Sequence, residues 1–136
     1  MSPSGSLDTN ILLRLVVQDD AAQTSLVARL LERHVRRSEP LWVPVTVMLE
    51  LEWVLRSRYR FAKADVVAAL SALLTTMELA FESEAALEQA LASYEEGNAD
   101  FGEYLHLALA QHTAALPFWT LDAKAAKAAG AKLLRA

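Results

Sequence analysis

The sequence predicts an α/β fold in which a short central parallel sheet is flanked by helices, giving three layers in the order α/β/α. Short apolar runs alternate with longer helical segments, which is typical of a parallel sheet covered on both faces. The 136 residues, 54% of them hydrophobic, suffice for one core. No linker or repeat interrupts the chain, so we expect one domain over residues 1–136, with residues 1–6 as a flexible N-terminal segment. Because the helix content is high for this class, a mostly helical bundle is the alternative.

The expected strands are short apolar runs bounded by polar residues, Gly or Pro, without helical periodicity. The first is very short because the preceding segment has a linker-like composition, and the last is expected at the edge of the sheet. In chain order, the runs lie around Leu7 and at residues 41–44, 78–81, 117–121 and 132–134.

Between these runs, apolar residues recur every three or four positions, which indicates amphipathic helices. Most of these segments begin at a residue that caps helices well, namely Asn10, Thr46, Ser83, Asp100 or Asp122. In chain order, the expected helices span residues 11–17, 21–37, 46–58, 63–76, 83–97, 100–112 and 122–130.

Charge is distributed unevenly along the chain. The formal net charge of −4 argues against a generic nucleic-acid binder. Residues 64–123 hold ten acidic and no basic residues, whereas residues 124–136 hold four basic and no acidic ones. Basic residues in the first half fit either solvated helix ends or a patch for phosphates or an acidic partner. Among them, Arg14, Arg56 and Arg58 could contact the phosphates of a bound ligand, with salt bridges at the rim as the alternative.

The composition also limits the compartment and the chemistry. The chain has no cysteine, which excludes disulfides, thiol catalysis and thiolate zinc sites. No apolar run is long enough to span a bilayer and the N-terminus lacks a signal-peptide core, so we expect a cytoplasmic protein without membrane contact. Trp42, Trp53 and Trp119 lie in apolar segments and are expected in the core rather than as base-stacking platforms.

Four acidic residues, Asp8, Glu50, Glu103 and Asp122, lie at or near the passage from an apolar run into a helix. A wound α/β sheet brings strand ends and helix starts to one rim. Two carboxylates about 4 Å apart repel by roughly 4 kcal/mol at an effective dielectric constant near 20, so a cluster of four indicates a divalent cation. Capping is the alternative: Asp8 and Asp122 can each cap a helix, and Asp100 with Glu103 has the spacing of a capping box.

Glu50 is the acid that is hardest to explain by capping. It lies within an apolar segment, beside the stripe formed by Leu51, Val54 and Leu55, and a partly buried glutamate needs a partner. Glu52 lies further round the same helix and is the better candidate for solvent.

Taken in order, these motifs resemble the PIN domain, and most closely its VapC-type subfamily, the toxins of type II toxin–antitoxin pairs. The resemblance covers nearly the whole chain and depends on the ordered set rather than on any one motif. It is carried by Asp8-Thr9-Asn10 after a strand, Glu50 in Glu-x-x-Trp-Val-Leu, Asp100-Phe101-Gly102-Glu103, and Thr120-x-Asp122.

The resemblance implies a Mg²⁺- or Mn²⁺-dependent endoribonuclease that hydrolyses RNA phosphodiester bonds, is usually a dimer, and is held inactive by a cognate antitoxin. By position, the catalytic and metal-binding residues would be Asp8, Glu50, Glu103 and Asp122, supported by Thr9, Asn10, Asp100 and Thr120. The family usually has Asp where this chain has Glu103. The extra methylene moves the carboxylate by about one bond length, in a site where Mg²⁺–oxygen distances are about 2.0–2.1 Å, so a bridging water is one solution.

Other functions remain as alternatives. A catalytically weak scaffold could bind an antitoxin, dimerise and take part in promoter autoregulation, because the apolar helices at 21–37 and 63–76 fit a partner groove as well as an ordinary core. Receiver domains and haloacid-dehalogenase-like phosphatases fit poorly, since Asp8-Thr9-Asn10 lacks the second acid that both would need nearby.

Overall fold

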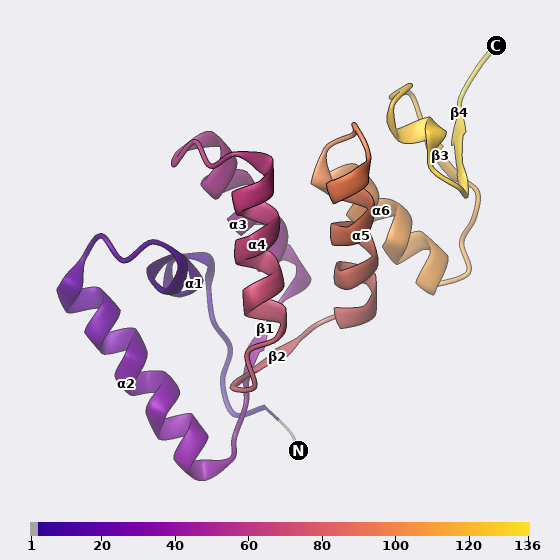
Figure 1. Cartoon of the computed structure of the whole chain (residues 1–136). Coiled ribbons are helices and arrows are strands. Elements are labelled where there is room, and N and C mark those ends of the chain that lie inside the picture. Colours follow the sequence, from indigo (N-terminus) through magenta and orange to yellow (C-terminus); the bar gives the residue numbers. More distant parts are fainter. Residues whose placement is uncertain (1–2) are drawn as a thin grey trace. The chain divides into compact units, whose positions relative to one another are not determined.

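The computed structural model describes residues 3–136, and the backbone of these residues forms two compact units, residues 3–82 and 83–136 (Figure 1). Each unit is described by itself. Helices alternate with short strands in both units, and the strand pairs of the described residues are parallel. The predicted α/β class, with short parallel strands flanked by helices, is confirmed.

The first unit is built around a parallel pair of three-residue strands. Its elements are α1 (Thr9–Val16), α2 (Ala21–Arg37), β1 (Leu41–Val43), α3 (Val45–Ser57), α4 (Lys63–Leu74) and β2 (Leu79–Phe81). β1 pairs with β2 in the register Val43↔Phe81. The helices pack α1 against α2 and α3, and α3 against α4, around a core that includes Leu12, Val43, Leu51, Leu55, Val66 and Leu70.

The strand expected around Leu7 is reduced to an isolated parallel bridge between Ser6 and Trp42. The Leu7 N–H donates to the Trp42 carbonyl at 2.9 Å, and the Trp42 N–H donates to the Gly5 carbonyl at 2.8 Å. Part of the N-terminal segment expected to be flexible is therefore held against β1. Residues 1 and 2 of that segment lie outside the described residues.

Two helices begin earlier than predicted. Asp8, not Asn10, is the N-cap of α1, because its carboxylate accepts the Ile11 N–H at 3.2 Å. Pro44, not Thr46, precedes α3, and its carbonyl accepts the N–H of Val47 at 3.0 Å. Proline suits such an entry because its φ angle is fixed and no N–H has to be satisfied there.

The two glutamates of α3 are placed opposite to the prediction. Glu52 is buried, with 1% of its surface exposed, whereas Glu50 is exposed. Burial of Glu52 is possible because Arg56, one helical turn later, donates from Nε to Oε2 of Glu52 at 2.8 Å. The buried stripe of α3 is therefore completed by an ion pair rather than by apolar residues alone.

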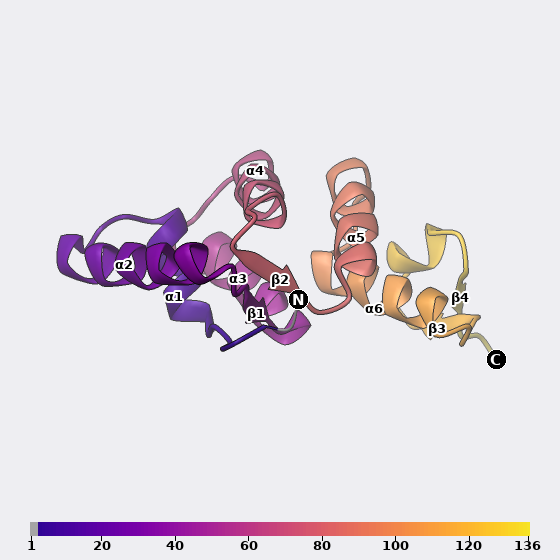
Figure 2. The same cartoon turned by 90° about the horizontal axis from the view of Figure 1, so that it is seen from below.

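The second unit consists of a helical hairpin followed by a two-stranded ribbon. Its elements are α5 (Glu84–Glu96), α6 (Phe101–His112), β3 (Phe118–Thr120), the 3₁₀ turn η1 (Ala125–Lys127) and β4 (Ala131–Leu133). α5 and α6 lie side by side in both views (Figures 1 and 2), and Tyr94 meets Phe101 edge to face at 5.7 Å between ring centroids.

The C-terminal strand is confirmed: β4 pairs with β3 in parallel, with Trp119 opposite Lys132. The helix predicted over residues 122–130 is wrong, since only η1 forms there. After it Ala128 is extended and Gly130 takes a φ of +92°, which lets the chain turn back and pair with β3. Within residues 3–136, no helix has the length and apolar character needed to cross a membrane.

Candidate active site

The first unit brings Glu50 next to the Asp8-Thr9 segment. Thr9 is buried at the start of α1, and its hydroxyl Oγ1 donates a hydrogen bond to Oε1 of Glu50 on α3. Residues 41 positions apart in the sequence are thus joined by one side-chain contact. The Asp8-Thr9 motif and the Glu50 motif therefore meet in space. The side chain of Asn10, which follows Thr9, is exposed and forms no hydrogen bond with any described residue.

The second unit fixes Asp122 through its own turn. The Asp122 N–H donates to Oγ1 of Thr120 at 3.0 Å. Oδ1 of Asp122 accepts the N–H groups of Lys124 at 2.8 Å and Ala125 at 3.3 Å. Thr120 thus orients the backbone of the acid, and the acid in turn shapes the chain that follows it.

Capping and metal binding are compatible for the two aspartates. Asp8 and Asp122 each use Oδ1 to accept backbone N–H groups. No described residue hydrogen-bonds or ion-pairs with Oδ2 of either one, and both side chains belong to exposed residues. The backbone therefore holds each carboxylate in place while its second oxygen remains available to a ligand. The predicted capping roles explain where these acids stand without excluding the predicted chemistry.

Asp100 and Glu103 do not form the capping box that was the alternative to metal binding. Asp100 occupies the N-cap position of α6, but its side chain makes no capping hydrogen bond. The Glu103 N–H instead donates to the Asp100 backbone carbonyl at 3.0 Å, and the Glu103 carboxylate has no hydrogen-bond partner within residues 3–136. Because capping does not occupy them, both carboxylates remain candidates for ligand binding.

One pocket of the second unit is lined by sequence neighbours of Asp100, Glu103 and Asp122, and not by these acids themselves. A cavity of about 320 Å³ is lined by Asn98, two residues before Asp100, by Tyr104, next to Glu103, and by Lys124, two residues after Asp122. The Tyr104 hydroxyl accepts the Ala99 N–H at 3.2 Å and so ties the start of α6 to the loop before it. The start of α6 and the turn after β3 therefore border the same space.

The donor atoms suit a hard cation. Asp and Glu oxygens are the ligands that Mg²⁺ and Mn²⁺ prefer, and the free Oδ2 atoms fit that use. Within residues 3–136, however, no three or more His, Asp or Glu side chains gather closely enough to hold a metal ion. Each unit by itself supplies two of the four predicted acids, so its own ligand set is partial.

Two of the three arginines considered for RNA binding are engaged elsewhere. Arg14 forms a salt bridge with Asp19, and Arg56 forms one with the buried Glu52. For these two residues the alternative of a salt bridge is therefore the one observed. A hydrogen bond to the Tyr59 hydroxyl, followed by the charge of Asp19, raises the pKa of Arg14 above its usual value. Arg58 is exposed, and its side chain forms no hydrogen bond or ion pair within the described residues.

Lys124 and Lys127 both line the pocket of the second unit, although no motif marks them as site residues. Their position in the sequence is the signal that could have found them. They lie two and five residues after Asp122, where a segment without any basic residue gives way to one without any acidic residue.

Comparison with protein families places this architecture in a known class. The PIN domain model matches residues 6–131, so the chain belongs to the PIN domain family. Members of this family are generally nucleases, and PIN nucleases bind RNA. Searches of curated proteins and of solved structures gave no match.

Proposed function

We propose that this protein is a Mg²⁺- or Mn²⁺-dependent endoribonuclease that acts as the toxin of a toxin–antitoxin pair. The carboxylates of Asp8, Glu50, Glu103 and Asp122 would hold the metal. The observation that supports this best is that Asp8 and Asp122 are each oriented by backbone N–H groups through one oxygen while the other oxygen stays available.

In such a centre, a cation held by these carboxylates would activate water and stabilise the charge that develops at the phosphodiester. The protein contributes by holding the metal-binding residues in place. Thr9 fixes one oxygen of Glu50, and Thr120 fixes the backbone of Asp122. The Thr9 hydroxyl thereby limits the motion of the Glu50 carboxylate, which would otherwise swing freely at an exposed position.

The test compares Asp8→Asn and Asp122→Asn with the unchanged protein in cleavage of structured RNAs at a series of Mg²⁺ and Mn²⁺ concentrations. An asparagine keeps the Oδ1 acceptor that caps the chain but loses the charge, so both variants should fold. We expect cleavage to fall by about 10²-fold or more, the size found when one preorganised electrostatic group is removed.

Asp20→Asn is the matched control. Asp20 caps α2 by accepting the Gln23 N–H at 3.0 Å, which is the role that Asp8 plays for α1, but it lies outside the proposed centre. It should cleave like the unchanged protein. Equal cleavage by well-folded Asp8→Asn and Asp122→Asn variants would reject the nuclease assignment.

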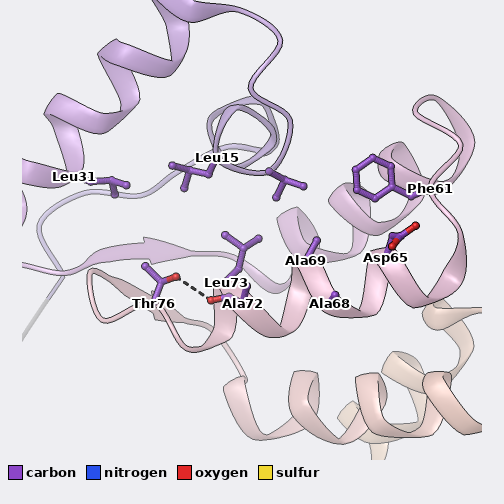
Figure 3. Close-up of a pocket in the computed structure, with 10 residues that line it drawn as sticks. Leu15, Leu31, Phe61, Asp65, Ala68, Ala69, Ala72, Leu73 and Thr76 are labelled. Atoms are coloured by element: carbon purple, nitrogen blue, oxygen red, sulfur yellow. Dashed lines mark hydrogen bonds between the residues drawn. The ribbon is translucent and has the colours of Figure 1, made fainter.

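Partner binding is the second candidate function, and a groove in the first unit favours it. The groove has a volume of about 670 Å³ and runs between α1, α2 and α4 (Figure 3). Leu15 of α1 and Leu31 of α2 face Ala69 and Leu73 of α4 across it (Figure 3). Among the described residues that line the groove, Asp65 alone is charged. An antitoxin segment with an apolar helical face and one basic residue would complement this groove.

Ala72→Arg tests this partner role, because Ala72 lines the groove and an arginine there would fill it. Ala64→Arg is the control, since Ala64 is exposed on the same helix and does not line the groove. We expect copurification with the cognate antitoxin to be lost only for Ala72→Arg. A scaffold without catalysis would bind this partner normally and show no metal-dependent cleavage.

The predicted homodimer is part of the same proposal. α2 exposes Leu26 and Val35, with 60% and 52% of their surfaces accessible, and such residues are common at subunit contacts. Light scattering of the purified protein measures the oligomeric state directly.

A further inference from the structure

The β3–β4 ribbon carries a large aromatic side chain on its outer face. Burial alternates along both strands: Trp119 and Lys132 are exposed, whereas their neighbours Phe118, Thr120 and Leu133 are half-buried. Trp119 has 54% of its surface accessible, so the expectation that it lies in the core is wrong. An indole kept in solvent contributes little to the core of this unit.

Lys132 places its cation over this indole, and two further basic residues line the same groove. Lys132 stands opposite Trp119 in the strand register, and its Nζ lies 5.5 Å from the centroid of the ring. A groove of about 760 Å³ beside the ribbon is lined by Trp119 together with Lys127, Lys132 and Arg135. These are three of the four basic residues of the acid-free segment 124–136.

The three cations are available to an external anion. Within residues 3–136, ion pairs involve Arg14, Arg36 and Arg56, and none involves Lys127, Lys132 or Arg135. All three are exposed. Exposed apolar neighbours such as Leu134 would also suit a protein partner, but a concentration of unpaired positive charge around an aromatic ring favours a polyanion with flat bases.

Proteins that bind single-stranded nucleic acids combine these two elements, an aromatic platform for a base and a basic groove for the backbone. We propose that the groove beside β3 and β4 binds single-stranded RNA, with a base stacked on Trp119 and phosphates facing Lys127, Lys132 and Arg135. This inference rests on the proposed function, for which it names the substrate-binding groove. Trp119 lies three residues before Asp122, at most about 10 Å away along the chain, so a base bound there would lie near the carboxylate proposed to hold the metal.

The experiment measures binding of fluorescein-labelled single-stranded RNA by anisotropy in the presence of EDTA, so that metal-dependent cleavage cannot intervene. Trp119→Ala should weaken binding by between about fivefold and a hundredfold, the range found for loss of one stacked base, and Trp119→Phe should retain most of the affinity. Trp53→Ala is the matched control, because Trp53 is also 54% exposed but lies on α3. It should bind like the unchanged protein.

Salt dependence tests the cations separately. Replacing Lys127, Lys132 and Arg135 together by alanine should reduce the slope of log K against log salt by about 2, since each single-strand phosphate contact contributes about 0.7. Unchanged RNA affinity of a folded Trp119→Ala protein overturns the inference. Equal binding of a duplex also overturns it, because paired bases cannot stack on an external ring.

The two proposals fail in different ways. If the unchanged protein binds RNA through Trp119 but does not cleave it with Mg²⁺ or Mn²⁺, the nuclease proposal fails and the groove stands. If it cleaves RNA, and Trp119→Ala binds and cleaves equally well, only the groove is rejected.

Discussion

Arg56→Met tests the energetic role of the ion pair inside α3. The Glu52 side chain is 2% exposed and its partner Arg56 is 39% exposed, with 2.8 Å between Arg56 Nε and Glu52 Oε2. Removing one partner of a fully buried pair costs about 3–5 kcal/mol. A hydrogen bond to a charged group contributes about 1.5–3 kcal/mol. Because solvent reaches the arginine, we expect the lower range to apply, a loss of about 2 kcal/mol in the free energy of unfolding.

Urea unfolding followed by tryptophan fluorescence measures this loss in the first unit alone if the background carries Trp119→Phe. The remaining tryptophans, Trp42 and Trp53, both belong to the first unit. Combining Arg56→Met with Glu52→Leu should recover more than half of the loss, since apolar residues of similar volume replace a buried pair at little cost.

Arg58→Met is the control for the removal of an arginine from this region. Arg58 is exposed at the end of α3 and unpaired within the described residues, so its replacement should change stability by less than about 0.5 kcal/mol. A loss below about 1 kcal/mol for Arg56→Met, or a double variant less stable than Arg56→Met, would refute the reasoning.

Two further changes address the helix hairpin and the contact beside Asp8. Phe101→Leu removes the edge-to-face pair with Tyr94 from a fully buried site and should cost about 1–2 kcal/mol in urea unfolding followed by circular dichroism; no measurable loss would contradict this packing. Thr9→Val removes the hydroxyl that holds Glu50 and should lower metal-dependent RNA cleavage by about 10–100-fold, whereas Thr9→Ser should restore it; equal cleavage by all three proteins would show that this contact has no functional role.

Local patterns predicted the elements of this fold well. The apolar runs at 41–44, 78–81 and 117–121 each contain a strand, and the last edge strand forms as expected. Their pairing could not be predicted in the same way, because a register such as Trp119↔Lys132 joins residues far apart in sequence. The exposed position of Trp119 follows from that pairing, so the apolar run alone gave the wrong environment.

In the candidate site, too, local features were predicted and contacts between helices were not. Asp8 and Asp122 were predicted as helix-start acids, and each accepts backbone N–H groups. The contact from Thr9 to Glu50 depends on how α1 meets α3, which no local pattern encodes. The burial of Glu52 was missed because its periodicity indicated solvent, although Arg56 stood four residues away as a possible partner.

The ion pair of Glu52 also has a geometric consequence for its helix. Residues two apart on an α-helix project about 200° apart, so anchoring Glu52 on the inner side of α3 obliges Glu50 to point away from that side. The buried side chains of Met48, Leu51 and Leu55 hold α3 in the same rotation. The inner face of the helix, with its ion pair, therefore sets the direction in which Glu50 meets Thr9.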